Sequence, residues 1–329
     1  MSVTSMDQSA TLPLKPRRPA KSLFFSREMA LMALIVFQVI VFSILFPISF
    51  PTFANFAAIA RNLALDGIMA TGMMLMMIGG CFDLSIGGMF SMAGVITGWL
   101  MKEAGLPVPL AVVIGLAVAA FGGWMNGLIV AKVKVNALIA TLGTMGIFRG
   151  LSVLLGGPGI SFLPPSFSRL GQAVFLGIQS PVWLMSLVVL LFQYLMARTR
   201  FFRQYYYIGS NQRAAYLSGI NVPRMQMLAF TLMGLLAGLS GIVFASRIAT
   251  SVSIAGDGAE LRVITAVILG GASLTGGKGT IWGAIIGVAF IALINNVLII
   301  SAVSTYWQSI IIGIVLVLAV AMDALLNRQ

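Results

Sequence analysis

The chain has 329 residues, of which 59% are hydrophobic and only 9% are charged. Because a soluble domain carries roughly 25% charged residues, this composition excludes a water-soluble globular protein. The formal net charge is +12, yet the basic residues gather in a few segments between apolar runs, which is typical of residues that orient membrane helices. We therefore expect contact with membrane lipid and not with nucleic acid. One cysteine, Cys81, rules out an internal disulfide and a thiol metal cluster, and the absence of histidine removes the commonest metal ligand; we expect no metal site.

Residues 1–27 form a basic tail, and the apolar run after it exceeds the roughly 7–15 residues of a cleavable signal peptide. We expect a retained helix there. Since a membrane-spanning helix needs about 20 mostly apolar residues, residues 28–329 predict a single all-α membrane domain, a polytopic bundle of about ten transmembrane helices. The expected spans are 29–47, 63–79, 85–101, 109–131, 137–155, 181–197, 225–246, 263–277, 281–300 and 306–323.

The basic residues predict the orientation of this bundle. If the tail is cytoplasmic, ten crossings return the C-terminus to the cytoplasm, and most Lys and Arg side chains then fall on that side. The longest inner connection is 198–224, which holds five arginines and no acid. The Gly/Pro-rich segment 156–180 falls outside, where a delivery protein could dock.

Two glycine-rich segments, GGCFDLSIGG (79–88) and GGASLTGGKGT (270–280), place paired glycines around short polar stretches. Glycine-broken segments in both halves of a membrane chain indicate discontinuous helices near a transport path. Asp83 is expected to cap a helix start, where an acid complements the helix dipole. The glycines assigned to these breaks are Gly79, Gly80, Gly87, Gly270, Gly271, Gly276 and Gly277.

The second segment also nearly matches a phosphate-binding P-loop. Here Gly279 follows Lys278, so the hydroxyl is displaced to Thr280, and the flanking segments are membrane helices instead of a strand and a helix. We therefore expect this chain to bind no nucleotide or other cofactor.

The inner connection predicts a short helix over 211–218, with Ser210 as its N-cap and Gly219 in the left-handed position that ends it. Such a helix has little of its own to pack against, so it suits insertion into a groove on another protein. An ordinary loop that only orients helices is the alternative. The residues assigned to docking are Ser210, Asn211, Arg213, Ala214, Ala215, Tyr216, Leu217 and Gly219.

Polar residues within the expected spans are costly, about 2.5–3.5 kcal/mol for Arg or Asp at a helix centre, so they should face the protein interior or water. Amides and one charged pair could line a path for a neutral, hydroxyl-rich solute. Amides that only bond across helices are the alternative, and whether Asp66 and Arg149 pair is left open. The candidate path residues are Asn62, Asp66, Asn126, Arg149 and Asn295.

Four segments together resemble one known family: 79–88, KVNALIATLGTMGIFRGL (134–151), IGSNQRAAYLSGINV (208–222) and VILGGASLTGGKGTIWGAIIG (267–287). The chain resembles the permease subunits of bacterial ABC importers for ribose, arabinose, xylose, galactose, rhamnose and autoinducer-2. The resemblance implies a non-enzymatic permease of the inner membrane. Its expected partners are ABC ATPase subunits that bind the ATP, a second permease copy or paralogue, and a periplasmic sugar-binding protein. The short helix then resembles the coupling helix that sits in the ATPase groove.

Other classes remain open from the residues alone. An ion-coupled secondary transporter would use acidic residues at mid-membrane, and of the expected spans only Asp66 comes near that position. A facilitator channel would conduct a small neutral solute downhill without ATP. A membrane enzyme is disfavoured because no carboxylate pair or metal set lies at a plausible site.

Overall fold

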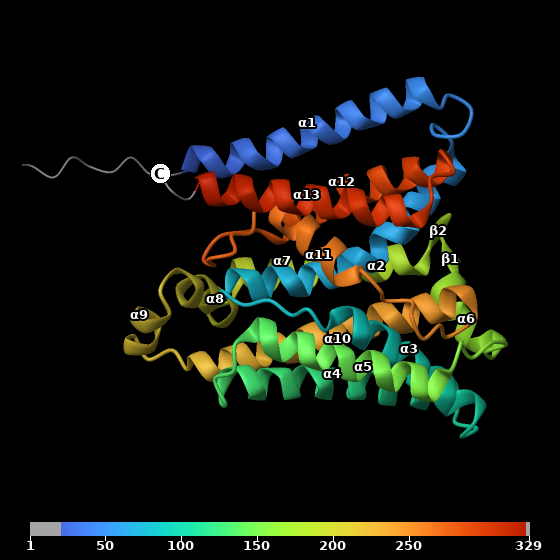
Figure 1. Ribbon diagram of the computed structural model, residues 1–329, viewed down its shortest axis with the longest axis horizontal. Coiled ribbons are helices and arrows are strands. Elements are labelled where there is room, and N and C mark those ends of the chain that lie inside the picture. Colours follow the sequence, from blue (N-terminus) through green and yellow to red (C-terminus); the bar gives the residue numbers. More distant parts are fainter. Residues whose placement is uncertain (1–20, 327–329) are drawn as a thin grey trace, which may run out of the picture.

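The computed structural model describes residues 21–326, so most of the 1–27 tail lies outside the described residues. The described chain is mainly helical, with irregular connections and one short hairpin (Figure 1). The helices are α1 Lys21–Leu45, α2 Phe53–Ile78, α3 Ile86–Lys102, α4 Val108–Ala131, α5 Ala137–Gly156, α6 Pro165–Gln172, α7 Ser180–Arg198, α8 Arg200–Ser210, α9 Gln212–Leu217, α10 Val222–Ile248, α11 Ala259–Leu269, α12 Ile281–Ile300 and α13 Thr305–Leu326. Strands β1 Val174–Phe175 and β2 Ile178–Gln179 form a small antiparallel hairpin.

The polytopic helical membrane bundle is confirmed. Each expected span falls on one helix of the described chain. Six helices are long and apolar enough to cross a membrane by themselves, namely α1, α4, α5, α7, α10 and α12, and α13 adds a shorter apolar stretch. The glycines along one face of α10 let the backbone of this helix pack directly against the backbones of α4 and α3. A Cβ on Gly234 would meet the carbonyl oxygen of Ala119 in α4, and one on Gly241 would meet that of Phe90 in α3.

Three of the expected boundaries are wrong by eight residues or more. Helix α1 begins at Lys21 and not at residue 29. Helix α2 begins at Phe53, ten residues before its expected start, because the Thr52 hydroxyl caps it by accepting the backbone N–H of Asn55 at 3.2 Å. The expected span 263–277 runs past the true end of α11 at Leu269. Gly271 adopts φ +102°, a left-handed conformation that a helix cannot continue through, so 270–280 forms an irregular connection to α12.

Helices α3 and α11 are too short to cross alone. Their 17 and 11 residues extend about 26 and 17 Å at 1.5 Å per residue, against a hydrocarbon core of about 30 Å. Irregular segments complete each crossing: residues 79–85 run back along the bundle from the end of α2 to α3 (Figure 1). The first turn of α3 abuts the turn before α11, since a Cβ on Gly87 would meet the Gly256 carbonyl and the Glu260 carboxylate. The predicted glycine-broken helices are thus present.

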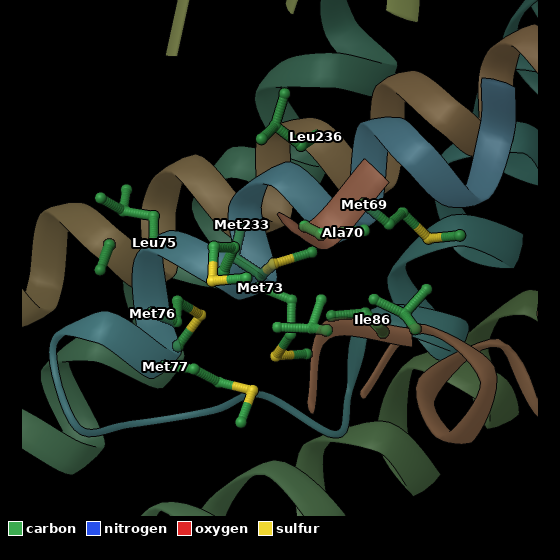
Figure 2. Packing of buried hydrophobic residues seen from close by; sticks show 14 of the residues in the cluster. Met69, Ala70, Met73, Leu75, Met76, Met77, Ile86, Met233 and Leu236 are labelled. Carbon is green, nitrogen blue, oxygen red and sulfur yellow. The ribbon is translucent and has the colours of Figure 1, made fainter. Parts of the chain in front are cut away.

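Methionine fills the centre of the bundle. Met73, Met74, Met76 and Met77 of α2 are buried, and Figure 2 shows methionines of this helix beside Met233 of α10. An unbranched thioether adapts to irregular gaps between helices. The run MMLMM at 73–77 therefore serves helix packing.

The two ends of the bundle differ. Helices α8 and α9 project at one end, while α6 and the β1–β2 hairpin lie at the other (Figure 1). We call these the α9 end and the α6 end.

Candidate functional site

The connection at the α9 end contains two helices where one was expected. Thr199 starts α8 by accepting the backbone N–H of Phe202 at 3.3 Å. The aromatic side chains of this helix recur at helical spacing, and Tyr205 is buried while Phe202 and Tyr206 are partly buried. That spacing was the signal in the sequence from which α8 could have been predicted.

The N-cap of α9 is Asn211, so the expectation of Ser210 was wrong. The Asn211 side chain accepts the backbone N–H of Ala214 at 2.9 Å. Ser210 instead ends α8, where its hydroxyl donates to the Tyr206 carbonyl at 2.8 Å. The predicted C-terminal stop holds, because Gly219 adopts φ +85°.

The docking residues divide between two faces of α9. Tyr216 and Leu217 are 68% and 78% exposed, and Arg213 and Ala214 are exposed beside them. Ala215 is only 4% exposed and packs in the main core. Ala215 therefore anchors α9 against the bundle, and it also lines the groove between α8 and α9. The exposed part of α9 is a small apolar tip, formed by Tyr216 and Leu217, with the cationic Arg213 at its edge.

A groove of about 770 Å³ separates α8 from α9. Arg200 and Arg203 line its α8 wall, and Asn211 and Ala214 line its α9 wall. None of the described residues that line it is acidic, so the groove is complementary to carboxylate or amide side chains of a partner.

The two glycine-rich segments meet each other at the α9 end. The Gly277 N–H donates to the Ile78 carbonyl at 2.9 Å, which joins the turn before α12 to the last turn of α2. Gly80, Gly276 and Gly277 have φ of +77°, +87° and +75°, values that favour glycine. Segments about 200 residues apart in the sequence thus form one structural unit.

A polar cavity of about 370 Å³ lies toward the α6 end, and three predicted path residues line it: Asn62, Asp66 and Asn295. Its volume is at the lower end of the roughly 300–1,000 Å³ of small-molecule sites. The Asn295 amide oxygen is buried and accepts no hydrogen bond among the described residues. It is therefore an unpaired acceptor covered by neighbouring atoms, while the Asn295 residue itself lines the cavity.

The chain matches the model of a family described as "Branched-chain amino acid transport system / permease component" over residues 55–320. The chain belongs to this permease family. It is 38% identical over 291 residues to the ribose import permease RbsC of Bacillus subtilis, covering 87% of this chain and 89% of the relative. It is 37% identical over 320 residues to RbsC of Escherichia coli K12, covering 95% and 98%. The autoinducer 2 import permease LsrC of Salmonella typhimurium is 37% identical over 261 residues, covering 79% and 75%. No solved structure matches the chain.

The two charged path candidates of the permease do not pair with each other. Arg149 of α5 contacts Glu260 at 2.9 Å and Asp257 at 3.1 Å. Asp66 of α2 contacts Arg262 at 3.5 Å. Asp257 and Arg262 line the cavity, so the Arg149 cluster adjoins it without Arg149 itself lining it.

Asn126 lies away from the cavity, in a buried network at the start of α3. Asp83 accepts hydrogen bonds from the Ser85 backbone N–H at 2.7 Å and the Ser85 hydroxyl at 2.6 Å. The Asn126 amide donates to the Ser85 hydroxyl at 2.8 Å. Asp83 therefore orders the approach to α3, although Ser85 holds the N-cap position expected for it.

Three charged residues of this region were missed: Asp257, Glu260 and Arg262. All lie in or next to a connection that was assigned to the outer side. In the permease this connection folds inward, where Gly256 abuts Gly87. In the sequence, these residues stood out only as two acids and an arginine close to several glycines. That pattern does not show which residues they pair with.

Proposed function

We propose that the permease forms the translocation path of an ATP-driven importer for a monosaccharide or small polyol. Hydrolysis takes place on two ABC ATPase subunits, and a second permease copy or paralogue completes the membrane unit. A periplasmic sugar-binding protein delivers the substrate at the α6 end. Both termini and the α9 end lie in the cytoplasm of a bacterial cell, with the bundle in the inner membrane.

One observation carries the proposal: a short, capped helix at one end of the bundle exposes Tyr216 and Leu217 beside an arginine-lined groove. These two large side chains lie on a six-residue helix, and because they are exposed to water they do not stabilise the permease fold. They suit the centre of an interface, where buried aromatic and apolar anchors supply most of the binding energy. The basic groove suits the polar rim of the same interface.

The cavity supports a neutral, hydroxyl-rich substrate. Asn62 and Asn295 line it with amide groups that suit hydroxyl groups, and Phe90 and Phe244 supply apolar walls. The relatives named for ribose and for autoinducer 2 fit the same substrate class.

An ion-coupled transporter is disfavoured by the state of the interior carboxylates. Asp66 is paired with Arg262, Glu260 is paired with Arg149, and Asp83 is bonded to Ser85. A coupling site needs a carboxylate that can exchange a proton or a sodium ion with water, and each of these is engaged by a neighbouring side chain.

The deciding experiment is reconstitution. The permease, its co-expressed ATPase subunits and the binding protein are placed in liposomes, and uptake of radiolabelled ribose is measured. We expect uptake that requires ATP and the binding protein and that persists after a proton ionophore and a sodium ionophore are added. Downhill flux without ATP would indicate a facilitator, and loss of uptake with the ionophores would indicate ion coupling.

A cavity variant tests the substrate path. Asn295→Leu removes an amide from the cavity lining, and loss of one net hydrogen bond of about 0.5–1.5 kcal/mol predicts a several-fold rise in the substrate concentration for half-maximal uptake. Asn296→Leu is the matched control. Asn296 bonds to Asn55 at 2.7 Å and is absent from the cavity lining, so it should lower stability without changing half-saturation. Equal half-saturation in both variants would remove Asn295 from the path.

A further inference from the structure

Three backbone segments meet at the α9 end of the bundle without side chains between them. A Cβ on Gly209 of α8 would overlap the Ile78 carbonyl of α2 and the Gly277 N–H. A Cβ on Gly276 would lie 2.9 Å from the Cα atoms of both Gly209 and Gly80, closer than non-bonded carbon atoms approach. We call Gly80, Gly209 and Gly276 the glycine junction.

Hydrogen bonds fix α8 to the elements around this junction. The Tyr206 hydroxyl donates to the Gly279 carbonyl at 2.9 Å, and the Tyr205 hydroxyl donates to the Met225 carbonyl of α10 at 2.9 Å. Burial raises the pKa of the Tyr206 phenol, so it remains a protonated donor throughout the physiological range. A tilt of α8 must therefore displace the turns after α2 and before α12.

Each of these turns leads to one of the two short helices. Residues 79–85 run from the junction into α3, and residues 270–280 connect α11 to α12. The first turn of α3 abuts the turn before α11 at Gly87 and Gly256, and Gly87 also lies against the Glu260 carboxylate of α11. Each helix also contributes to the cavity at the α6 end, through Phe90 of α3 and Arg262 of α11. A continuous packed route thus runs from α9 to the cavity wall.

We propose that the glycine junction is the joint through which movement of α9 and α8 reaches α3 and α11 and reshapes the cavity. The proposal rests on the docking of ATPase subunits at α9. Packed backbones transmit displacement because no flexible side chain absorbs it, and the left-handed glycines let both turns reorient without a steric penalty. Gly209 is then a positioning residue for transport. It contacts neither the substrate nor the ATPase subunits, but it links movement of α9 to the shape of the cavity.

The test uses a reporter that needs no knowledge of the substrate. Asn62→Cys, at the cavity, is introduced with Cys81→Ala, and labelling by a membrane-impermeant maleimide is followed in the reconstituted complex. We expect trapping with ATP and vanadate to change the labelling rate. Gly209→Ala should reduce that change by about tenfold, within the range of mutations along a coupling network, while the ATPase subunits still copurify. Tyr206→Phe, which deletes one hydrogen bond without adding volume, should reduce it by a smaller factor.

Gly313→Ala is the matched control, because a Cβ at this α13 glycine meets no atom within 4 Å, and it should retain the full labelling change. A full change in Gly209→Ala would overturn the proposal. So would a parent complex that binds ATPase and shows no change at position 62. If Gly209→Ala fails to assemble, Tyr206→Phe decides, and a full change there also overturns the proposal. Loss of ATPase copurification in the parent would instead refute the proposed function.

Discussion

Leu217→Glu will remove the ATPase subunits from the purified permease. Leu217 is 78% exposed at the tip of α9, so the substitution leaves the permease fold intact but places a charge where an apolar anchor enters the partner's groove. Loss of a central anchor costs about 2 kcal/mol or more, which is about a 30-fold weaker complex or worse. Copurification from detergent and ATPase activity in the membrane fraction measure the effect.

Leu176→Glu provides a closely matched control for this result. Leu176 lies in the turn of the β1–β2 hairpin at the α6 end and is 76% exposed, so the chemistry and the exposure are nearly the same. We expect it to leave ATPase association unchanged. ATPase recovery at the parental level with Leu217→Glu would show that α9 is not the docking helix.

Arg149→Met will strongly destabilise the permease. It leaves Glu260, whose side chain is only 10% exposed, without its cation at membrane depth. Removing one partner of a buried ion pair costs about 3–5 kcal/mol. The second partner adds little, because the Asp257 side chain is 54% exposed and exposed pairs contribute about 0–1 kcal/mol. The melting temperature of the purified permease in detergent reports the loss.

The double variant Arg149→Met/Glu260→Met tests whether the loss of stability comes from the unpaired Glu260 charge. With both charges gone, no buried ion remains uncompensated, so the melting temperature should recover most of the way to the parental value. Arg262→Met breaks a longer pair with Asp66 at 3.5 Å, whose carboxylate side chain is more exposed than that of Glu260, and should cost less. A melting temperature unchanged by Arg149→Met would contradict this account of the α5–α11 contact.

The sequence predicted the helices of the bundle well because long apolar runs have few alternatives in a membrane. It predicted the interruptions less well. The run from 263 to 277 is apolar enough to resemble one helix, and only the left-handed φ of Gly271 shows where it stops. Ser210 and Asn211 are adjacent and both suit an N-cap, so composition did not choose between them. The choice follows from α8, whose aromatic face packs inward and places Ser210 in its last turn.

The contacts that join distant segments were not predictable from one sequence. Arg149 and Glu260 lie on helices that only the tertiary fold brings together, and no spacing rule pairs them. The glycine junction likewise needs the packing of α2, α8 and the turn before α12. Its glycines could be recognised as unusual, yet their mutual contact depends on all three elements.

The central claim is that α9 lies in the cytoplasm, where it can receive force from ATPase subunits. Its most direct test is the accessibility of Ser218→Cys, an exposed position after α9, to a membrane-impermeant maleimide in cells that express the permease without its ATPase. We expect labelling in inverted membrane vesicles and none in intact spheroplasts. Labelling in intact spheroplasts would place α9 outside the cell and contradict the mechanism.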